Sequence, residues 1–96
     1  SKMYFAIINI DKPKSLDLRM STREEHLQYL RDAGDALYIA GPVLMDDGET
    51  PMGSLVIIDA ENLDAAKEFS KNDPYAKAGL FISSTVTTWR KVFPES

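Results

Sequence analysis

The sequence lacks the features that mark several large classes of protein. It contains no cysteine, which excludes disulfides and thiolate-bound metals and favours a reducing compartment, so we expect a cytoplasmic protein. No apolar run approaches the roughly 18 to 20 residues that a membrane-spanning helix needs. The 11 basic residues are outnumbered by 15 acidic ones and form no cluster. We therefore expect neither a membrane protein nor a nucleic-acid-binding surface.

Common catalytic and metal-binding signatures are also missing. The chain has no phosphate-binding loop, nucleophile elbow or dinucleotide-binding fingerprint. With one histidine and no cysteine, a zinc site has little support. Asp46, Asp47 and Glu49 share one polar stretch, but their spacing is not that of a calcium loop, so a solvated acidic turn is the better interpretation. We expect no metal and no cofactor.

What the sequence does contain predicts a small α+β domain. Its 96 residues suffice for one domain, which we place at residues 3–93. Short apolar runs predict strands, whereas apolar residues at helical spacing and capping signals predict helices. The expected strands are 3–10, 35–44, 53–59 and 80–90, and the expected helices are 21–34 and 63–71.

The order of these elements, βαββαβ, is that of the ferredoxin-like fold. We therefore expect a four-stranded antiparallel sheet with two helices on one face. Ser21 and Glu24 have the spacing of a capping box, and Gly34 is a stop signal, which together set the limits of the first helix. Gly41 and Pro42 are expected to end or bend the second strand.

Apolar side chains on both faces of two strands predict a partner. In the first strand Phe5 and Ile7 alternate with Tyr4 and Ile8, all apolar, and the third strand has the same character. Two helices cover only one face, so the other is expected to pack against a second copy of the chain. A pocket would then lie between the two copies. The alternative is that the loops at 11–20 and 43–52 half-cover this face.

His26 is the single histidine, so imidazole chemistry near neutral pH falls to it. At about 100° per residue, it lies in the middle of an apolar arc with Tyr29, Leu30 and Ala33. Such a histidine is either a structural residue with satisfied hydrogen bonds or a general acid or base. The residues alone leave both interpretations open.

Asp73 and Arg23 are the candidate partners of His26. Asp73 precedes Pro74, a pairing typical of a helix N-cap, and a carboxylate in that role has spare acceptor sites to orient an imidazole. Arg23 is suited to bind a carboxylate or enolate of a substrate. It is equally suited to a plain ion pair with Glu24, Glu25 or Asp73.

Three motifs in order resemble those of the YCII-related family: RxxH ending at His26, AGP ending at Pro42, and DPYAKAG at 73–79 before the last predicted strand. The likeness extends from about Met3 to Phe93. It implies a ferredoxin-like chain of the dimeric α/β-barrel type. Some family members are implicated in dehydrohalogenation of hydroxylated aromatic rings, and most have no assigned activity.

The resemblance also implies roles for individual residues. The family's active site is a His-Asp pair, whose positions here are His26 and Asp73. Arg23, Gly41 and Pro42 occupy the other recurrent motif positions, which implies that they contact the substrate.

Two classes of function fit these residues. The first is a cofactor-independent enzyme that acts on a small aromatic or enolisable molecule, in the manner of a lyase or dehydrohalogenase. The second is a homodimer that binds a small ligand, or modulates a partner enzyme, without catalysis. A third option is an oxygenase of the cofactor-free kind found among dimeric α/β barrels.

Overall fold

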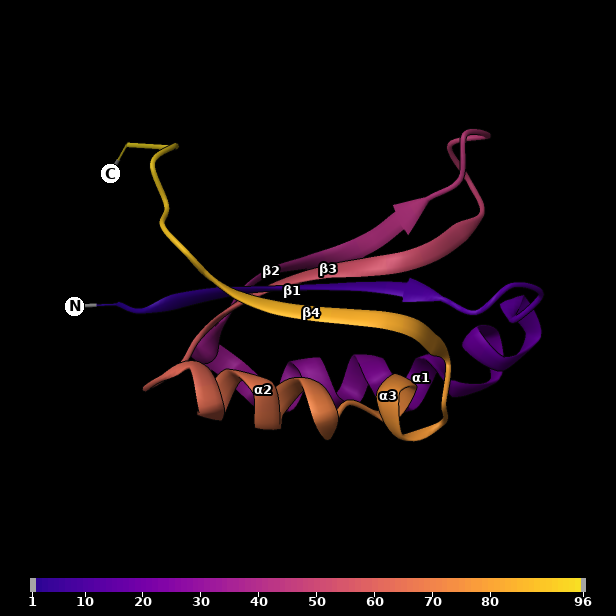
Figure 1. The fold of residues 1–96 in the computed structure, drawn as a ribbon, viewed down its shortest axis with the longest axis horizontal. Coiled ribbons are helices and arrows are strands. Elements are labelled where there is room, and N and C mark those ends of the chain that lie inside the picture. Colours follow the sequence, from indigo (N-terminus) through magenta and orange to yellow (C-terminus); the bar gives the residue numbers. More distant parts are fainter. Residues whose placement is uncertain (1, 96) are drawn as a thin grey trace.

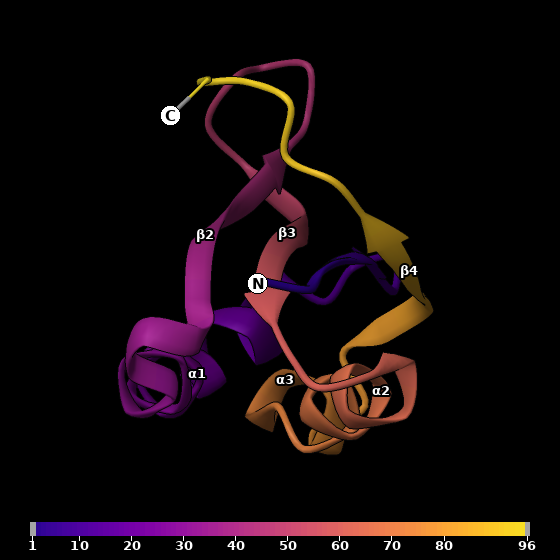
Figure 2. The same cartoon turned by 90° about the vertical axis from the view of Figure 1, so that its left-hand side faces the viewer.

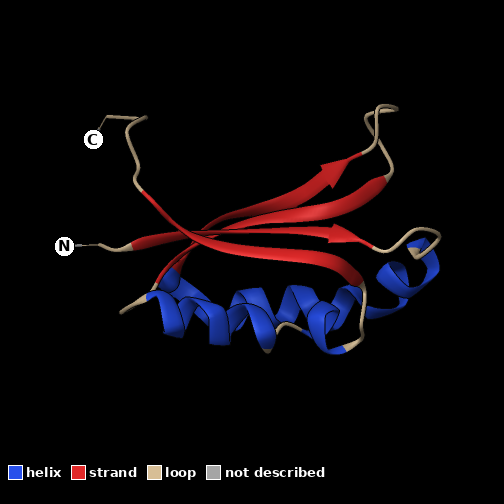
Figure 3. Cartoon of the chain, viewed as in Figure 1, coloured by secondary structure: helices blue, strands red, loops and turns tan. Residues whose placement is uncertain are grey.

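The computed structural model describes residues 2–95 and confirms the expected ferredoxin-like α+β fold. All helices lie on one side of a single sheet (Figures 1 and 3). A single 3₁₀ turn, Gly34–Ala36, follows the first helix. The elements in chain order are β1 (Tyr4–Asp11), α1 (Leu16–Ala33), β2 (Leu37–Leu44), β3 (Pro51–Asp59), α2 (Leu63–Lys71), α3 (Pro74–Lys77) and β4 (Phe81–Trp89).

The sheet is antiparallel with the strand order β2-β3-β1-β4. The two central strands, β1 and β3, are therefore the two with apolar residues on both faces. Viewed end-on, α1 lies beneath the β2 side of the sheet, while α2 and α3 lie together beneath the β4 side (Figure 2).

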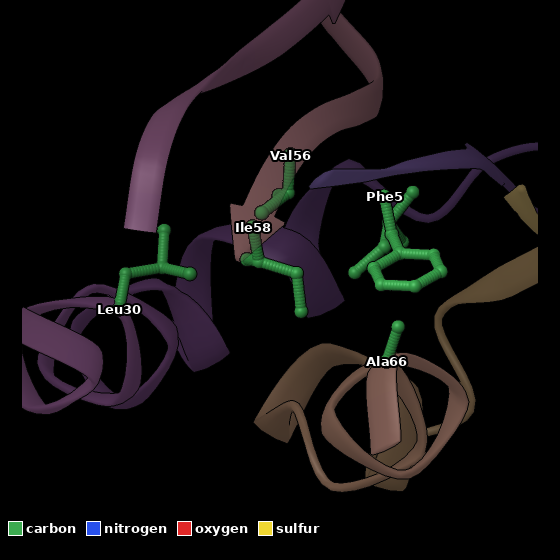
Figure 4. Close-up of a cluster of buried hydrophobic side chains, with 6 residues drawn as sticks. Phe5, Leu30, Val56, Ile58 and Ala66 are labelled. Carbon is green, nitrogen blue, oxygen red and sulfur yellow. The ribbon is translucent and has the colours of Figure 1, made fainter. Parts of the chain in front are cut away.

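The hydrophobic core fills the space between the sheet and the helices. Phe5 and Ile7 of β1 and Val56 and Ile58 of β3 point towards the helices and are each at most 2% exposed. Leu30 of α1 and Ala66 of α2 close the cluster from below, as Figure 4 shows. Leu63 and Phe69, six residues apart in α2, pack against it. The alternation of β1 and β3 thus determines which set of side chains is buried.

The start of α1 differs from the prediction. The helix begins at Leu16, five residues before Ser21, whose hydroxyl donates to the Leu18 carbonyl within the helix instead of capping it. The N-cap is Ser15, which follows Pro13 and makes no side-chain capping bond. Gly34 ends the helix with a positive φ of 59°, as predicted. None of the helices within residues 2–95 is long and apolar enough to cross a membrane.

The course of β2 narrows the prediction. The strand does not end at Gly41 and Pro42 but continues to Leu44, and its ribbon bends along its length (Figure 2). Proline is tolerated because β2 is an edge strand, where a missing N–H costs no ladder bond on the solvent side. The neighbouring β3 begins at Pro51, two residues before the predicted start.

The face of the sheet opposite the helices is covered only in part, since Ala6 and Ile57, which pair on it, are 5% and 6% exposed. Ile8, Ile39 and Leu55 lie on it and are between 40% and 56% exposed. The expected alternative, cover by the loops at 11–20 and 43–52, is wrong: much of the first range is in α1 on the other side, and the β2–β3 hairpin rises away from the sheet (Figure 1). The C-terminal segment rises on the same side.

Gly53 gives a stability test of the central sheet. A methyl group there would meet the Asn9 carbonyl oxygen at 2.2 Å, whereas one at Gly41 would meet nothing within 4 Å. We expect Gly53→Ala to lower the free energy of unfolding by at least about 1–3 kcal/mol, because β1 and β3 must separate to admit it. Gly41→Ala, the control, should change it by no more than about 1 kcal/mol. Urea unfolding measures both, and equal effects would contradict the close approach.

Candidate active site

His26 and Asp73 meet beneath the sheet although they lie 47 positions apart. The imidazole Nδ1 is 2.8 Å from the Asp73 carboxylate Oδ1, and the two side chains are 8% and 6% exposed. His26 comes from the middle of α1, and Asp73 is the N-cap of α3 with Pro74 following. The same Oδ1 accepts the Tyr75 backbone N–H at 2.9 Å. Capping and contact with the imidazole therefore occur together, as the acceptor capacity of a carboxylate allows.

The hydrogen bonds determine which imidazole nitrogen faces outward. A carboxylate only accepts, so Nδ1 of His26 carries the proton of the bond to Asp73. In the neutral ring Nε2 then carries the free lone pair, and no residue among 2–95 hydrogen-bonds it. His26 also lines the main cleft of the chain. The neutral ring is thus in the tautomer that accepts a proton from a molecule in the cleft.

Tyr75 holds His26 in place from the side. Its ring stacks on the imidazole with centroids 4.0 Å apart and an angle of 16° between planes. Burial raises the pKa of the Tyr75 phenol, an effect opposed by the nearby Arg19 and Arg23 and reinforced by Asp73. The phenol therefore stays neutral through the physiological range.

Arg19 is a site residue that the sequence reasoning missed. Its Nε donates to Asp11 Oδ2 at 2.7 Å, and its Nη2 donates to Asp11 Oδ1 at 3.2 Å and to the Gly53 carbonyl at 2.8 Å. The guanidinium carbon lies 4.6 Å from the centre of the Tyr75 ring. The signal was the spacing of Arg19, Thr22, His26 and Leu30, the buried residues of α1, but a helix begun at Ser21 excludes its first member.

The cleft has a volume of about 600 Å³ and lies on the helix side of the sheet. One wall is α1 and the other is β2, whose residues 40, 42 and 44 face α1, with Ser54 and Val56 of β3 between them. We expected the pocket between two copies at the open face, and this was wrong. It lies on the opposite face, because α1 stands apart from the edge strand it covers.

Arg23, Gly41 and Pro42 all line this cleft. Arg23 is exposed, and within the described chain no carboxylate lies within 4.0 Å of it, so the expected ion pairs with Glu24, Glu25 or Asp73 do not form. Gly41, across the cleft, leaves its backbone open to close approach by a ligand. The arrangement offers an exposed cation on one wall and accessible backbone on the other.

The β2–β3 loop forms the rim of the cleft. Asp47 accepts bonds from the Thr50 hydroxyl and from the backbone N–H groups of Glu49 and Thr50, all of which hold its pKa below the usual range. Glu49 lines the cleft. Across residues 2–95 no group of three or more histidine, cysteine or acidic side chains is placed to hold a metal ion. The acidic stretch is therefore an ordered turn.

Comparison with known proteins identifies the family of this chain. The sequence profile of the YCII-related domain matches residues 3–90. The chain belongs to the YCII-related family. An uncharacterized protein of Haemophilus influenzae is 40% identical over 98 residues, and protein YciI of Escherichia coli is 38% identical over 99; each comparison covers 95% of this chain and all of the relative.

Solved structures share the YCII-related fold. The 5-chloro-2-hydroxyhydroquinone dehydrochlorinase TftG of Burkholderia phenoliruptrix, in complex with 2,5-dihydroxybenzoquinone, is 36% identical, with a TM-score of 0.83 over 92% of this chain and 94% of TftG. SnoaB, a cofactor-independent oxygenase of Streptomyces nogalater, has a TM-score of 0.62 at 9% identity over 99% of this chain and all of SnoaB. The second likeness shows the fold alone.

The buried ion pair of Asp11 and Arg19 gives a second stability test. Their side chains are 7% and 6% exposed, so Asp11→Ala leaves a buried charge without its partner. We expect the free energy of unfolding to fall by about 3–5 kcal/mol, and the double variant with Arg19→Leu to recover much of it. Lys2→Met breaks the exposed pair with Asp59 and should cost less than about 1 kcal/mol. Chemical unfolding of all three measures this; an effect of Asp11→Ala as small as that of Lys2→Met would contradict it.

Proposed function

We propose that this YCII-related chain is a cofactor-independent acid/base enzyme of the cytoplasm that acts on a small aromatic or enolisable molecule, in the manner of a lyase or dehydrohalogenase. His26 acts as general base and acid, and Asp73 orients its ring and stabilises the imidazolium. Arg23 and the backbone at Gly41 and Pro42 contact the substrate. No metal or cofactor takes part.

One observation carries the proposal: the 2.8 Å contact of Nδ1 with Asp73, which leaves Nε2 of the same ring free at a cleft. A base must be held in the correct tautomer and must reach its proton, and this arrangement provides for both. The likeness to TftG, a dehydrochlorinase, supports a substrate that is a halogenated phenol.

The chemistry for such a substrate needs only proton transfer. Nε2 takes the proton of a ring hydroxyl, and the electron pair of the broken O–H bond forms a carbonyl. The imidazolium then gives a proton to the ring carbon that bears the halogen. A second hydroxyl then loses its proton and becomes a carbonyl, and the halide leaves with the electron pair of its bond. The net change is loss of hydrogen halide, so no external oxidant is required. Asp73 stabilises the imidazolium that forms between the two transfers.

Asp73→Asn separates catalysis from folding. Asparagine also caps helices, so the bond from the Tyr75 N–H is retained, but the charge that stabilises the imidazolium is lost. We expect kcat for chloride release from 5-chloro-2-hydroxyhydroquinone to fall by about 10²- to 10⁴-fold, with His26→Gln at least as impaired. Arg31→Met, an exposed change on the far side of α1, is the control. Full turnover by His26→Gln would refute the assignment.

We further propose that two chains form a twofold homodimer through their open sheet faces. Ile8, Ile39 and Leu55 are an apolar patch on this face, and isologous packing buries it in both copies at once. The β2–β3 hairpin and the C-terminal segment project on the same side, and each carries exposed apolar residues: Met45, and Val92 with Phe93. These segments are placed to extend the contact.

Sedimentation tests the homodimer. The chain should sediment as a dimer at micromolar concentration, and Leu55→Asp should shift it to the monomer because a charge at the centre of an apolar contact is costly. Leu16→Asp is the matched control, since Leu16 is similarly exposed but lies at the start of α1 on the helix side. A monomeric wild-type chain under these conditions would refute the dimer.

A further inference from the structure

The donors in the cleft gather around Arg19. Its Nε and Nη2 are fully engaged with Asp11 and the Gly53 carbonyl, but its Nη1 makes no hydrogen bond to any residue among 2–95. The side chain is nine-tenths or more buried and also lines the cleft. Asp11 and the Gly53 carbonyl therefore fix the position of the guanidinium, while the two N–H groups of Nη1 remain available to a ligand.

Ser54 adds a second donor next to Arg19. Its hydroxyl oxygen accepts from the buried amide Nδ2 of Asn9 at 3.3 Å, which leaves the hydroxyl hydrogen to donate elsewhere. Ser54 lines the cleft and directly follows Gly53, whose carbonyl holds Arg19. The fixed guanidinium and the hydroxyl are thus neighbours at the floor of the cleft.

Tyr75 sets the spacing between this donor group and the base. Its ring contacts His26 at 4.0 Å between centroids and the Arg19 guanidinium carbon at 4.6 Å. Arg19 and His26 are seven residues apart in α1, about 10.5 Å along the helix axis, so a ring between the two side chains fills the interval. An acceptor nitrogen and a cationic donor pair therefore flank one aromatic ring at a fixed separation.

We propose that Arg19 Nη1 and the Ser54 hydroxyl form an anion subsite, which selects planar molecules that carry an anionic oxygen at one end and an acidic proton for His26 at the other. This deepens the proposed function, because it names the class of molecule that the same cleft takes: aromatic carboxylates, phenolates or enolates. Arg19 is the fixed anchor, since Asp11 holds it in a forked, bidentate geometry. Arg23, exposed at the mouth, adds positive charge on approach.

Binding of non-reacting anions tests the subsite. Benzoate represents carboxylates and para-nitrophenolate represents phenolates, each titrated into the wild-type chain by NMR beside its neutral counterpart, benzamide or para-nitroanisole. We expect at least one anion to bind tighter than its neutral counterpart, and which one shows whether the subsite prefers a carboxylate or a phenolate. The inference is overturned if neither anion binds more tightly than its neutral counterpart.

Substitutions then assign the affinity to Arg19 and Ser54. Arg19→Lys keeps the charge but loses the fork, and should weaken anion binding by about tenfold or more. Ser54→Ala should weaken it by about three- to tenfold. Neither change should alter the affinity for the neutral counterpart, and Arg31→Met should alter neither affinity.

The measurements distinguish loss of the anion subsite from loss of folding and from loss of catalysis. Thermal unfolding identifies variants that remain folded. If Arg19→Lys does not fold, Ser54→Ala still decides the test. Because the probes bind without reacting, selective loss of anion affinity supports the subsite whether or not His26 proves catalytic. Unchanged anion affinity in a folded Arg19→Lys or in Ser54→Ala overturns it, even if turnover by His26 is established.

Discussion

The contact between His26 and Asp73 is the constraint on which the site depends. One carboxylate oxygen accepts from the Tyr75 backbone and contacts the imidazole, so the start of α3 and the middle of α1 are fixed relative to each other through a single atom. Because both side chains are buried, loss of either leaves a polar group without a partner. The same carboxylate therefore supports folding and the orientation of the ring.

A second carboxylate plays the equivalent role near the start of α1. Asp11, the last residue of β1, holds Arg19 and through it the first turns of the helix, while Arg19 also bonds to β3 at Gly53. Tyr75 packs against both anchored side chains, those of His26 and Arg19. The cleft is thus bounded by side chains whose positions are determined by buried polar contacts rather than by the apolar core alone.

The sequence predicted the architecture well because it depends on local patterns. The two-sided apolar strands β1 and β3 are the central ones, and the helix expected at 63–71 forms with Ala66 in the core. The predicted start of α1 was wrong because Arg19, a charged residue, is buried through its contacts with Asp11, Gly53 and Tyr75, which hydrophobic periodicity does not reveal.

The candidate site was predictable only in part. His26 was identified as the single histidine and Asp73 as a cap that could also orient the imidazole, but the resemblance to a family was needed to favour this pair over the alternatives, since no local rule joins residues 47 positions apart. Arg23, Gly41 and Pro42 do line the cleft. The predicted location of the cleft was wrong, because alternation shows which strand residues are apolar but not where a helix stands away from the sheet.

Pro42 has a consequence for how sheets of this protein can meet. It occupies the middle of the edge strand β2, where it presents no N–H to an incoming chain. A strand that tried to extend the sheet beyond β2 would find its hydrogen-bond ladder interrupted at that point. The residue therefore protects the chain against edge-to-edge polymerisation and fibril growth from this side, while it leaves the sheet faces free to associate.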